Sequence, residues 1–211
     1  MDTAMMGRGG NARVRKQAQS GFSLLEVMIS MVILTVGLVS LLGVFGLAMA
    51  STQTSQQDMI AKQLANEAYE SIVTARNSSQ LNWSQINNAG SCGSGSDPSS
   101  GGIFLPSTST NPTFYPIYNS GADGIVGTCD DTVAGEQTLE EPGPDGNYGD
   151  ADDVMLPLTG YQRTVVISPL YDASGNMVAS LRSVTITVQY TTPRMTQQRT
   201  YTLNAYISQY Q

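Results

Sequence analysis

Two stretches of the chain repeat one pattern of glycines and aspartates. Residues 121–131 read GADGIVGTCDD and residues 143–153 read GPDGNYGDADD, so both follow G-x-D-G-x-x-G-x-x-D-D at an offset of 22 residues. A repeat this close favours repeated chemistry over chance. Clustered carboxylates on glycine-rich turns supply the hard oxygen ligands that Ca²⁺ requires, six to eight at about 2.4 Å. The candidate ligands are Asp123, Asp130 and Asp131 in the first copy and Asp145, Asp150, Asp152 and Asp153 in the second.

Calcium is the expected cofactor, and no other cofactor is expected. The spacing departs from the EF-hand loop, so the calcium prediction rests on the chemistry of the donor atoms alone. The alternative interpretation is two solvated acidic turns that keep the surface soluble. Paired carboxylates also occur in glycoside hydrolases, but no pattern of cleft-lining aromatic residues accompanies them here.

A long apolar stretch precedes the repeats. It runs from Gly21 to Ala50 as GFSLLEVMISMVILTVGLVSLLGVFGLAMA and is interrupted by one charged residue, Glu26. As a helix, Val27 to Ala50 would rise about 36 Å, which is enough to cross a bilayer core of about 30 Å. The residues before it include four basic side chains and one acidic one. This charge pattern predicts a cytoplasmic leader and export of the rest of the chain.

The segment KQAQSGFSLLEVMISMVIL resembles the prepilin signature of type IV pilins and of type II secretion pseudopilins. A secretory signal peptide would have its small-residue cleavage site after the apolar run, whereas Gly21 lies before it. The resemblance implies that a prepilin peptidase removes residues 1–21 by cutting between Gly21 and Phe22. It also implies methylation of the new Phe22 amine, and partners among other pilin subunits and the inner-membrane assembly machinery.

Glu26 lies four residues, or about one helical turn, after Phe22. A carboxylate at the edge of an apolar membrane helix costs up to about 3 kcal/mol, so such a residue is usually paired or functional. In one interpretation it pairs with the Phe22 amine of its own chain, near the positive end of the helix dipole. In the other, it meets the Phe22 amine of a neighbouring filament subunit and sets the axial register, and the pilin resemblance supports this second interpretation.

The patterns along the chain predict an α+β fold with one long N-terminal helix packed on a C-terminal antiparallel sheet. Residues 22–50 are the membrane or filament-core half of the helix, and residues 51–76 are an amphipathic continuation. Residues 77–160 are a Gly/Ser-rich loop region that contains the acidic repeats. Residues 161–211 alternate apolar and polar side chains, and the amphipathic half of the helix is the one long element able to cover their apolar face.

Three strands are expected within residues 161–211, at 161–170, 177–190 and 200–207. The sequence YDASGN between the first two is typical of a hairpin turn. A break around Pro193 is expected between the second and the third. The result would be a three-stranded meander with one apolar face.

Composition narrows the range of functions. The chain has no histidine, the usual general base and the commonest zinc ligand, so no enzymatic activity is expected. After the leader, six basic side chains oppose sixteen acidic ones, so nucleic acid is not an expected partner. Cys92 and Cys129 both fall in the exported part, where an oxidising compartment favours a disulfide. Two free buried thiols are the alternative.

Within the superfamily, GLVSLLG, RSVTITVQYTTPR and YTLNAYIS look most like the PilV-type minor pilins. This resemblance implies a low-copy subunit that primes or modifies pilus assembly, lies near the tip and contacts surfaces. The expected location is the bacterial inner membrane, with one span and a periplasmic C-terminal head. After assembly it would be a cell-surface pilus or a periplasmic pseudopilus. Two alternatives stay open, a minor pseudopilin of a type II secretion system and a membrane-anchored calcium-dependent binding module that does not polymerise.

Overall fold

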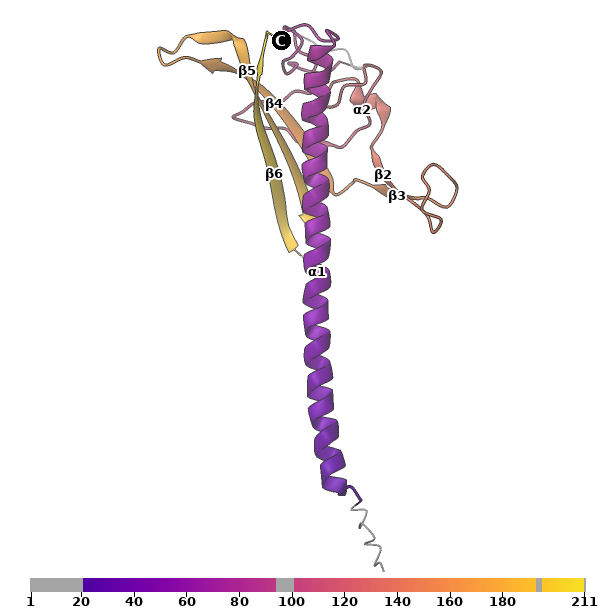
Figure 1. Cartoon of the computed structure of the whole chain (residues 1–211). Coiled ribbons are helices and arrows are strands. Elements are labelled where there is room, and N and C mark those ends of the chain that lie inside the picture. Colours follow the sequence, from indigo (N-terminus) through magenta and orange to yellow (C-terminus); the bar gives the residue numbers. More distant parts are fainter. Residues whose placement is uncertain (1–20, 94–100, 193–194, 211) are drawn as a thin grey trace, which may run out of the picture. The chain divides into compact units, whose positions relative to one another are not determined.

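The computed structural model describes residues 21–93, 101–192 and 195–210 (Figure 1). The chain divides into two compact units, Met1–Ala48 and Met49–Gln211, which are described separately. The expected leader, apart from Gly21, lies outside the described residues, and so does the expected break at Pro193.

One helix, α1, runs without interruption from Leu24 to Asn77. In the first unit its side chains are mostly apolar and almost all exposed, and α1 is long and apolar enough to cross a membrane by length and composition. Ser30 and Ser40 donate hydrogen bonds to backbone carbonyls four residues earlier, so these hydroxyls are satisfied within the helix. The helix ends where Ser79 adopts a left-handed backbone conformation with φ 58°.

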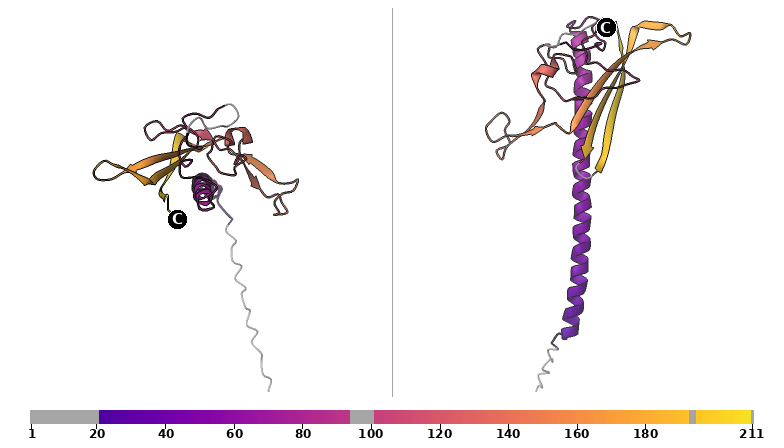
Figure 2. Two further views of the ribbon diagram at one scale, coloured as in Figure 1. Left: turned by 90° about the horizontal axis from the view of Figure 1, so that it is seen from above. Right: turned by 180° about the vertical axis from the view of Figure 1, so that it is seen from behind.

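The second unit contains a four-stranded antiparallel sheet in the order β1-β4-β5-β6. Its strands are β1 (Tyr115–Pro116), β4 (Tyr161–Tyr171), β5 (Met177–Thr192) and β6 (Met195–Ser208). The part of α1 that belongs to this unit lies beside the sheet in both side views (Figures 1 and 2).

A single hydrophobic core joins this part of α1 to the sheet. Small and branched side chains of α1, including Ala61, Leu64 and Ile72, are buried against Ile186 and Val188 of β5. The α+β fold predicted from the sequence is therefore confirmed. All the buried core residues lie at or after Ala61, so the second unit contains the whole of the described core.

The region between α1 and β4, expected to be loop, also forms short elements. It contains β1, the one-turn helix α2 (Asp131–Ala134) and a separate antiparallel pair, β2 (Thr138–Glu141) and β3 (Val154–Pro157). These elements have two to four residues each, which is too short to give a periodic pattern. β1 adds a fourth strand to the sheet, next to the three strands expected within residues 161–211, which are β4, β5 and β6.

The last two strands are longer than expected. β5 continues to Thr192 and β6 begins at Met195, and Thr191 still pairs with Gln198 across the two strands. The pairing shifts register between Thr191 and Thr192.

A buried arginine ties β4 to α1. The side chain of Arg163 is 5% exposed, and its Nη1 donates to the carbonyl of Leu64 at 2.9 Å and to Glu67 Oε2 at 3.3 Å. A buried guanidinium requires such partners, because an unpaired charge in the core is strongly destabilising. This pair holds the strand that packs beside the first acidic loop.

Candidate functional site

The first acidic repeat forms a loop between β1 and α2 that is packed on the core. Asp131, the first residue of α2, is 1% exposed. Its Oδ1 accepts the N–H of Gly121 at 2.8 Å, and its Oδ2 accepts the N–H groups of Gly127 and Thr128 at 2.6 and 3.2 Å. One carboxylate therefore holds the start of the loop against its end.

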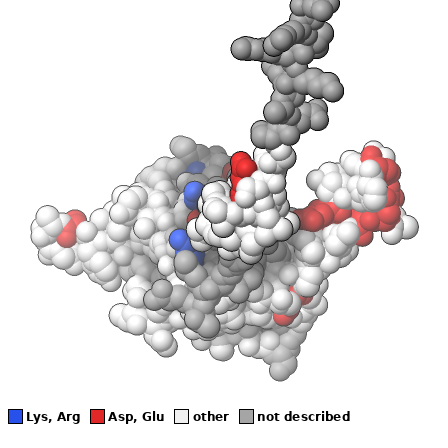
Figure 3. Space-filling view, turned by 90° about the horizontal axis from the view of Figure 1, so that it is seen from below, with Lys and Arg blue, Asp and Glu red and all other residues white. Residues whose placement is uncertain are grey.

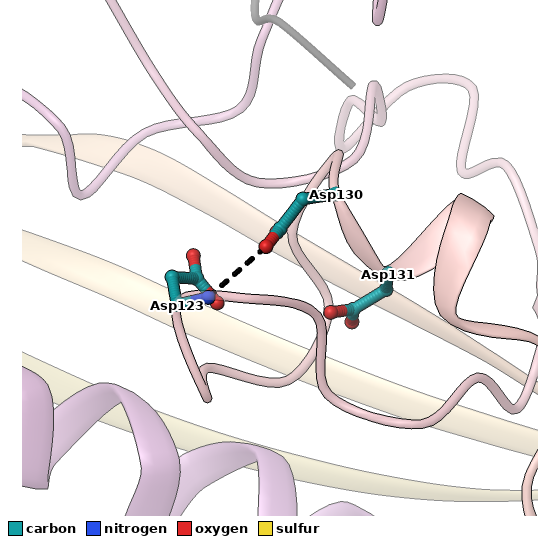
Figure 4. Close-up of side chains that lie close together, drawn as sticks. All are labelled: Asp123, Asp130 and Asp131. Atoms are coloured by element: carbon teal, nitrogen blue, oxygen red, sulfur yellow. Dashed lines mark hydrogen bonds between the residues drawn. The ribbon is translucent and has the colours of Figure 1, made fainter. Parts of the chain in front are cut away.

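Three carboxylates of this loop turn toward one another (Figure 4). One oxygen from each of Asp123, Asp130 and Asp131 lies within 4.8 Å of the others. Asp130 Oδ2 also accepts the backbone N–H of Asp123 at 3.2 Å. Ligands around one Ca²⁺ at about 2.4 Å lie at most about 4.8 Å apart, so these three oxygens match the spacing of a shared cation.

The second repeat forms the same loop at the tip of the β2–β3 hairpin. Asp153 closes this loop in the same way as Asp131 closes the first one. It accepts the N–H groups of Gly143, Gly149 and Asp150 at 3.1, 2.5 and 3.1 Å. The two stretches are thus repeated in structure as well as in sequence.

The first glycine of each loop is required by a close approach. A Cβ added to Gly121 would lie 2.3 Å from Asp130 Oδ2, and one added to Gly143 would lie 2.3 Å from Asp152 Oδ2. Any larger residue would displace these carboxylates. Glycine at the first position of each copy therefore makes room for Asp130 and Asp152 to lie against the start of their loops.

The second loop brings together three of its four predicted ligands. Oxygens of Asp145, Asp150 and Asp152 lie within 4.8 Å of one another, and all three residues are exposed. Asp153 does not belong to this group, although Asp131, which accepts the equivalent N–H groups, belongs to the group of the first loop. Asp150 is the third member in the second loop. Acidic side chains gather on the projecting hairpin (Figure 3).

Two further residues near the loops were missed by the sequence analysis. Thr128 stands at the repeat position that Asp150 has in the second copy, and its hydroxyl donates to Asp130 Oδ1 at 2.6 Å. Aligning the two copies position by position would have identified it. Glu140 Oε1 accepts the N–H of Gly149 at 3.1 Å, but Glu140 lies outside the repeat and gave no sequence signal.

The surroundings of the loops give their carboxyl groups different pKa values. Burial raises the pKa of Asp131 to about 6, although three backbone N–H groups act in the opposite direction. Burial also raises the pKa of Asp123. In the exposed loop, the backbone N–H of Asn147 lowers the pKa of Asp145, and the side-chain hydrogen bond with Asp152 raises that of Asp150. Keeping all three aspartates ionised is therefore less favourable in the buried first loop than in the exposed second loop.

A disulfide anchors the first loop. Cys92 and Cys129 are bonded, with Cα atoms 5.5 Å apart and a sequence separation of 37. Cys129 is 1% exposed, directly precedes Asp130, and donates its N–H to the carbonyl of Ile103 at 2.9 Å. The oxidised state expected from the sequence is the one the structure contains.

The N-terminal segment places the expected cleavage point ahead of the helix. Gly21 and Phe22 have no helical assignment, and α1 begins at Leu24. Phe22 is 83% exposed, and Glu26 lies exposed in the first turn of α1. The Gly21–Phe22 peptide is therefore accessible in a non-helical segment, as a peptidase requires. In the uncut chain Phe22 has no free amine, so its pairing with Glu26 stays a prediction.

The N-terminal segment matches a known protein family. Residues 16–42 match the family model of the prokaryotic N-terminal methylation motif. The chain has the prepilin signature of type IV pilins. Such a signature is typical of structural subunits that a prepilin peptidase processes and that the pilus assembly machinery handles. No curated protein and no solved structure matches the pilin-like chain.

Proposed function

We propose that the chain is a minor pilin, a low-copy structural subunit of a type IV pilus that primes or modifies filament assembly near the tip. The observation that supports this proposal most is the prepilin segment, with an accessible Gly21–Phe22 peptide directly ahead of an exposed apolar helix. The length of the chain and the long acidic segment between α1 and β4 favour a minor pilin over a major one.

The apolar half of α1 would serve in two environments. Its large apolar side chains from Leu24 to Leu47 are exposed within the first unit, so lipid or neighbouring helices can cover them without breaking contacts inside that unit. Burying apolar surface contributes about 25 cal/mol per Å², and this favours the bundling of helices once they leave the bilayer. Glu26 would then pair with the Phe22 amine of a neighbouring subunit.

Mass spectrometry of the mature N-terminus tests this proposal. In cells with an active prepilin peptidase, we expect the chain to begin at an N-methylated Phe22. The Gly21→Val chain is expected to keep its leader, because the peptidase cuts directly after this residue and valine is bulkier than glycine. Gly37→Ala is the matched control, since an added Cβ at Gly37 meets no atom within 4 Å. A wild-type chain that keeps its leader in such cells would contradict the proposal.

We also propose that both acidic loops bind Ca²⁺. The supporting observation is that each of two independent loops brings three aspartate oxygens within 4.8 Å of one another, by the same backbone geometry. The alternative of an anchored binding module that does not polymerise shares this property. It differs from the pilin proposal in predicting an uncut leader and no requirement for Glu26.

Calcium is expected to raise the melting temperature of residues 51–211, which contain the whole described core. A ligand at 100 times its Kd stabilises the folded state by about 2.7 kcal/mol, or very roughly 5–10 °C for a domain of this size. Combining Asp123→Asn with Asp152→Asn would weaken both loops and reduce the shift. Glu136→Gln, an exposed acid between the loops, is the control and should keep it. A melting curve that millimolar calcium leaves unchanged would refute calcium binding.

The calcium effect should also depend on pH. The folded-state pKa of Asp131 is raised to about 6, above the value near 4 of an unfolded chain. Its contribution to stability is therefore present below about pH 4 and lost as the pH rises through 6. A bound cation offsets that loss, so the calcium-induced shift should be larger at pH 7 than at pH 5.

A further inference from the structure

A partly apolar groove lies where the β4–β5 hairpin leaves the core. It encloses about 370 Å³ and is lined by Trp83, Pro169, Met177, Val178, Leu181 and Arg182, among others. Met177 is 59% exposed and Leu181 is 36% exposed. Apolar side chains around an accessible groove are typical of a site that another chain covers.

A fixed cation lies in this groove. The guanidinium carbon of Arg182 is 4.6 Å from the ring centroid of Trp83, and its Nη1 donates to the carbonyl of Ile86. Trp83 is held in turn by a hydrogen bond from Nε1 to the carbonyl of Ala179 at 2.8 Å. No carboxylate pairs with Arg182 among the described residues, whose ion pairs involve Arg163 and Arg199. A guanidinium has five N–H donors, so most of them remain available for an anion.

The β2–β3 hairpin has the complementary surface. Val154, Met155 and Leu156 of β3 are 51%, 55% and 38% exposed. In the ladder with β2, Glu140 pairs with Met155 and Glu141 pairs with Val154, and further acidic side chains gather on the projecting hairpin (Figure 3). A two-stranded sheet with so little cover is marginally stable alone, which favours a partner surface. Seen from above, this hairpin and the β4–β5 hairpin project from opposite sides of the second unit (Figure 2).

We propose that the groove at Trp83 and Arg182 binds the β2–β3 hairpin of a second copy of this chain. Arg182 pairs with the exposed Glu141 of the incoming hairpin, which lies opposite Val154 in the β2–β3 ladder and outside the proposed calcium ligands. The apolar side chains of β3 cover Met177 and Leu181. Because the two surfaces lie on opposite sides of one unit, a chain cannot satisfy both by itself. The contact is head-to-tail, and it leaves one groove and one hairpin free at the ends of every group of copies. Copies of a low-copy subunit would therefore be neighbours.

Cysteine cross-linking of the full-length chain tests this contact. Met155→Cys and Met177→Cys are made separately, with the native cysteines left in their disulfide, and the two purified chains are mixed in detergent with a short bismaleimide. We expect a cross-linked dimer from the mixture and little from either variant alone, because each single variant has the reactive thiol on one side. A chain with both substitutions should give a ladder of higher oligomers.

Adding Arg182→Gln to the Met177→Cys chain should lower the dimer yield about tenfold, the effect expected for losing a charge pair at an interface. Arg182→Lys keeps the charge and should retain part of the yield. Arg199→Gln removes a cation of β6 outside the groove and should retain the yield in full. Melting curves confirm that each variant is folded. The proposal is overturned if the mixture gives no more dimer than the single variants, or if folded Arg182→Gln chains cross-link as well as Arg199→Gln chains.

Discussion

Replacing Glu26 with glutamine will lower the amount of the chain found in filaments by about 100-fold or more. Glu26 is the one charged residue in the apolar stretch from Gly21 to Ala50. In an assembled filament the Phe22 amine would be buried among apolar helices, and removing its carboxylate partner leaves an uncompensated charge. Breaking a buried pair in this way typically costs about 3–5 kcal/mol. Immunoblots of sheared filaments and of the membrane fraction measure the distribution of the chain.

The matched control is Glu70→Gln, which removes an exposed glutamate from the same helix within the second unit. This variant should enter filaments normally. Both variants should show wild-type melting curves, because neither side chain belongs to the core. The mature mass should also confirm that each has lost its leader. Wild-type amounts of the Glu26→Gln chain in filaments would show that no subunit contact depends on this carboxylate.

Removing the disulfide will lower the free energy of unfolding of the second unit by about 4 kcal/mol. The Cys92–Cys129 bond closes a loop with a sequence separation of 37, and the chain-entropy model gives about 4 kcal/mol for a loop of this length. Urea unfolding of Cys92→Ser/Cys129→Ser residues 51–211, compared with the oxidised wild type, measures this difference.

Adding a reductant supplies the control. It should shift the wild-type transition toward that of the double variant and leave the double variant unchanged. Because Cys129 directly precedes Asp130, the loss of the disulfide should also weaken the calcium response of the first loop. The second loop has no disulfide and should keep its response. Equal unfolding free energies in the oxidised and reduced states would contradict this account.

The largest elements could be predicted because their sequence patterns are long. The apolar run and its amphipathic continuation predicted α1, and the alternation near the C-terminus predicted the antiparallel sheet. The burial of Arg163 could not be predicted in this way. This residue lies on the same face of β4 as Val165 and Ile167, and its burial depends on a carbonyl and a carboxylate of α1, about 100 residues earlier in the chain.

The acidic loops were predictable as a pair, but the roles of their residues were not. The repeat gave the candidate aspartates, but it did not show that Asp150 rather than Asp153 would join Asp145 and Asp152 in the second group. The burial of Asp131 depends on the packing of its loop against the core, which no local pattern records. Short elements such as β1 and β2 depend on their partners in the same way.

The two loops share one backbone design in two different dielectric surroundings. In one copy the closing carboxylate, Asp131, is almost fully covered, and in the other the loop stands in water at the end of a hairpin. The two loops therefore allow the effect of burial on cation preference to be compared within one molecule. Any difference between the loops in preference for Ca²⁺ over Mg²⁺ measures what desolvation and the exchange of Thr128 for Asp150 contribute, with the geometry of the turn held constant.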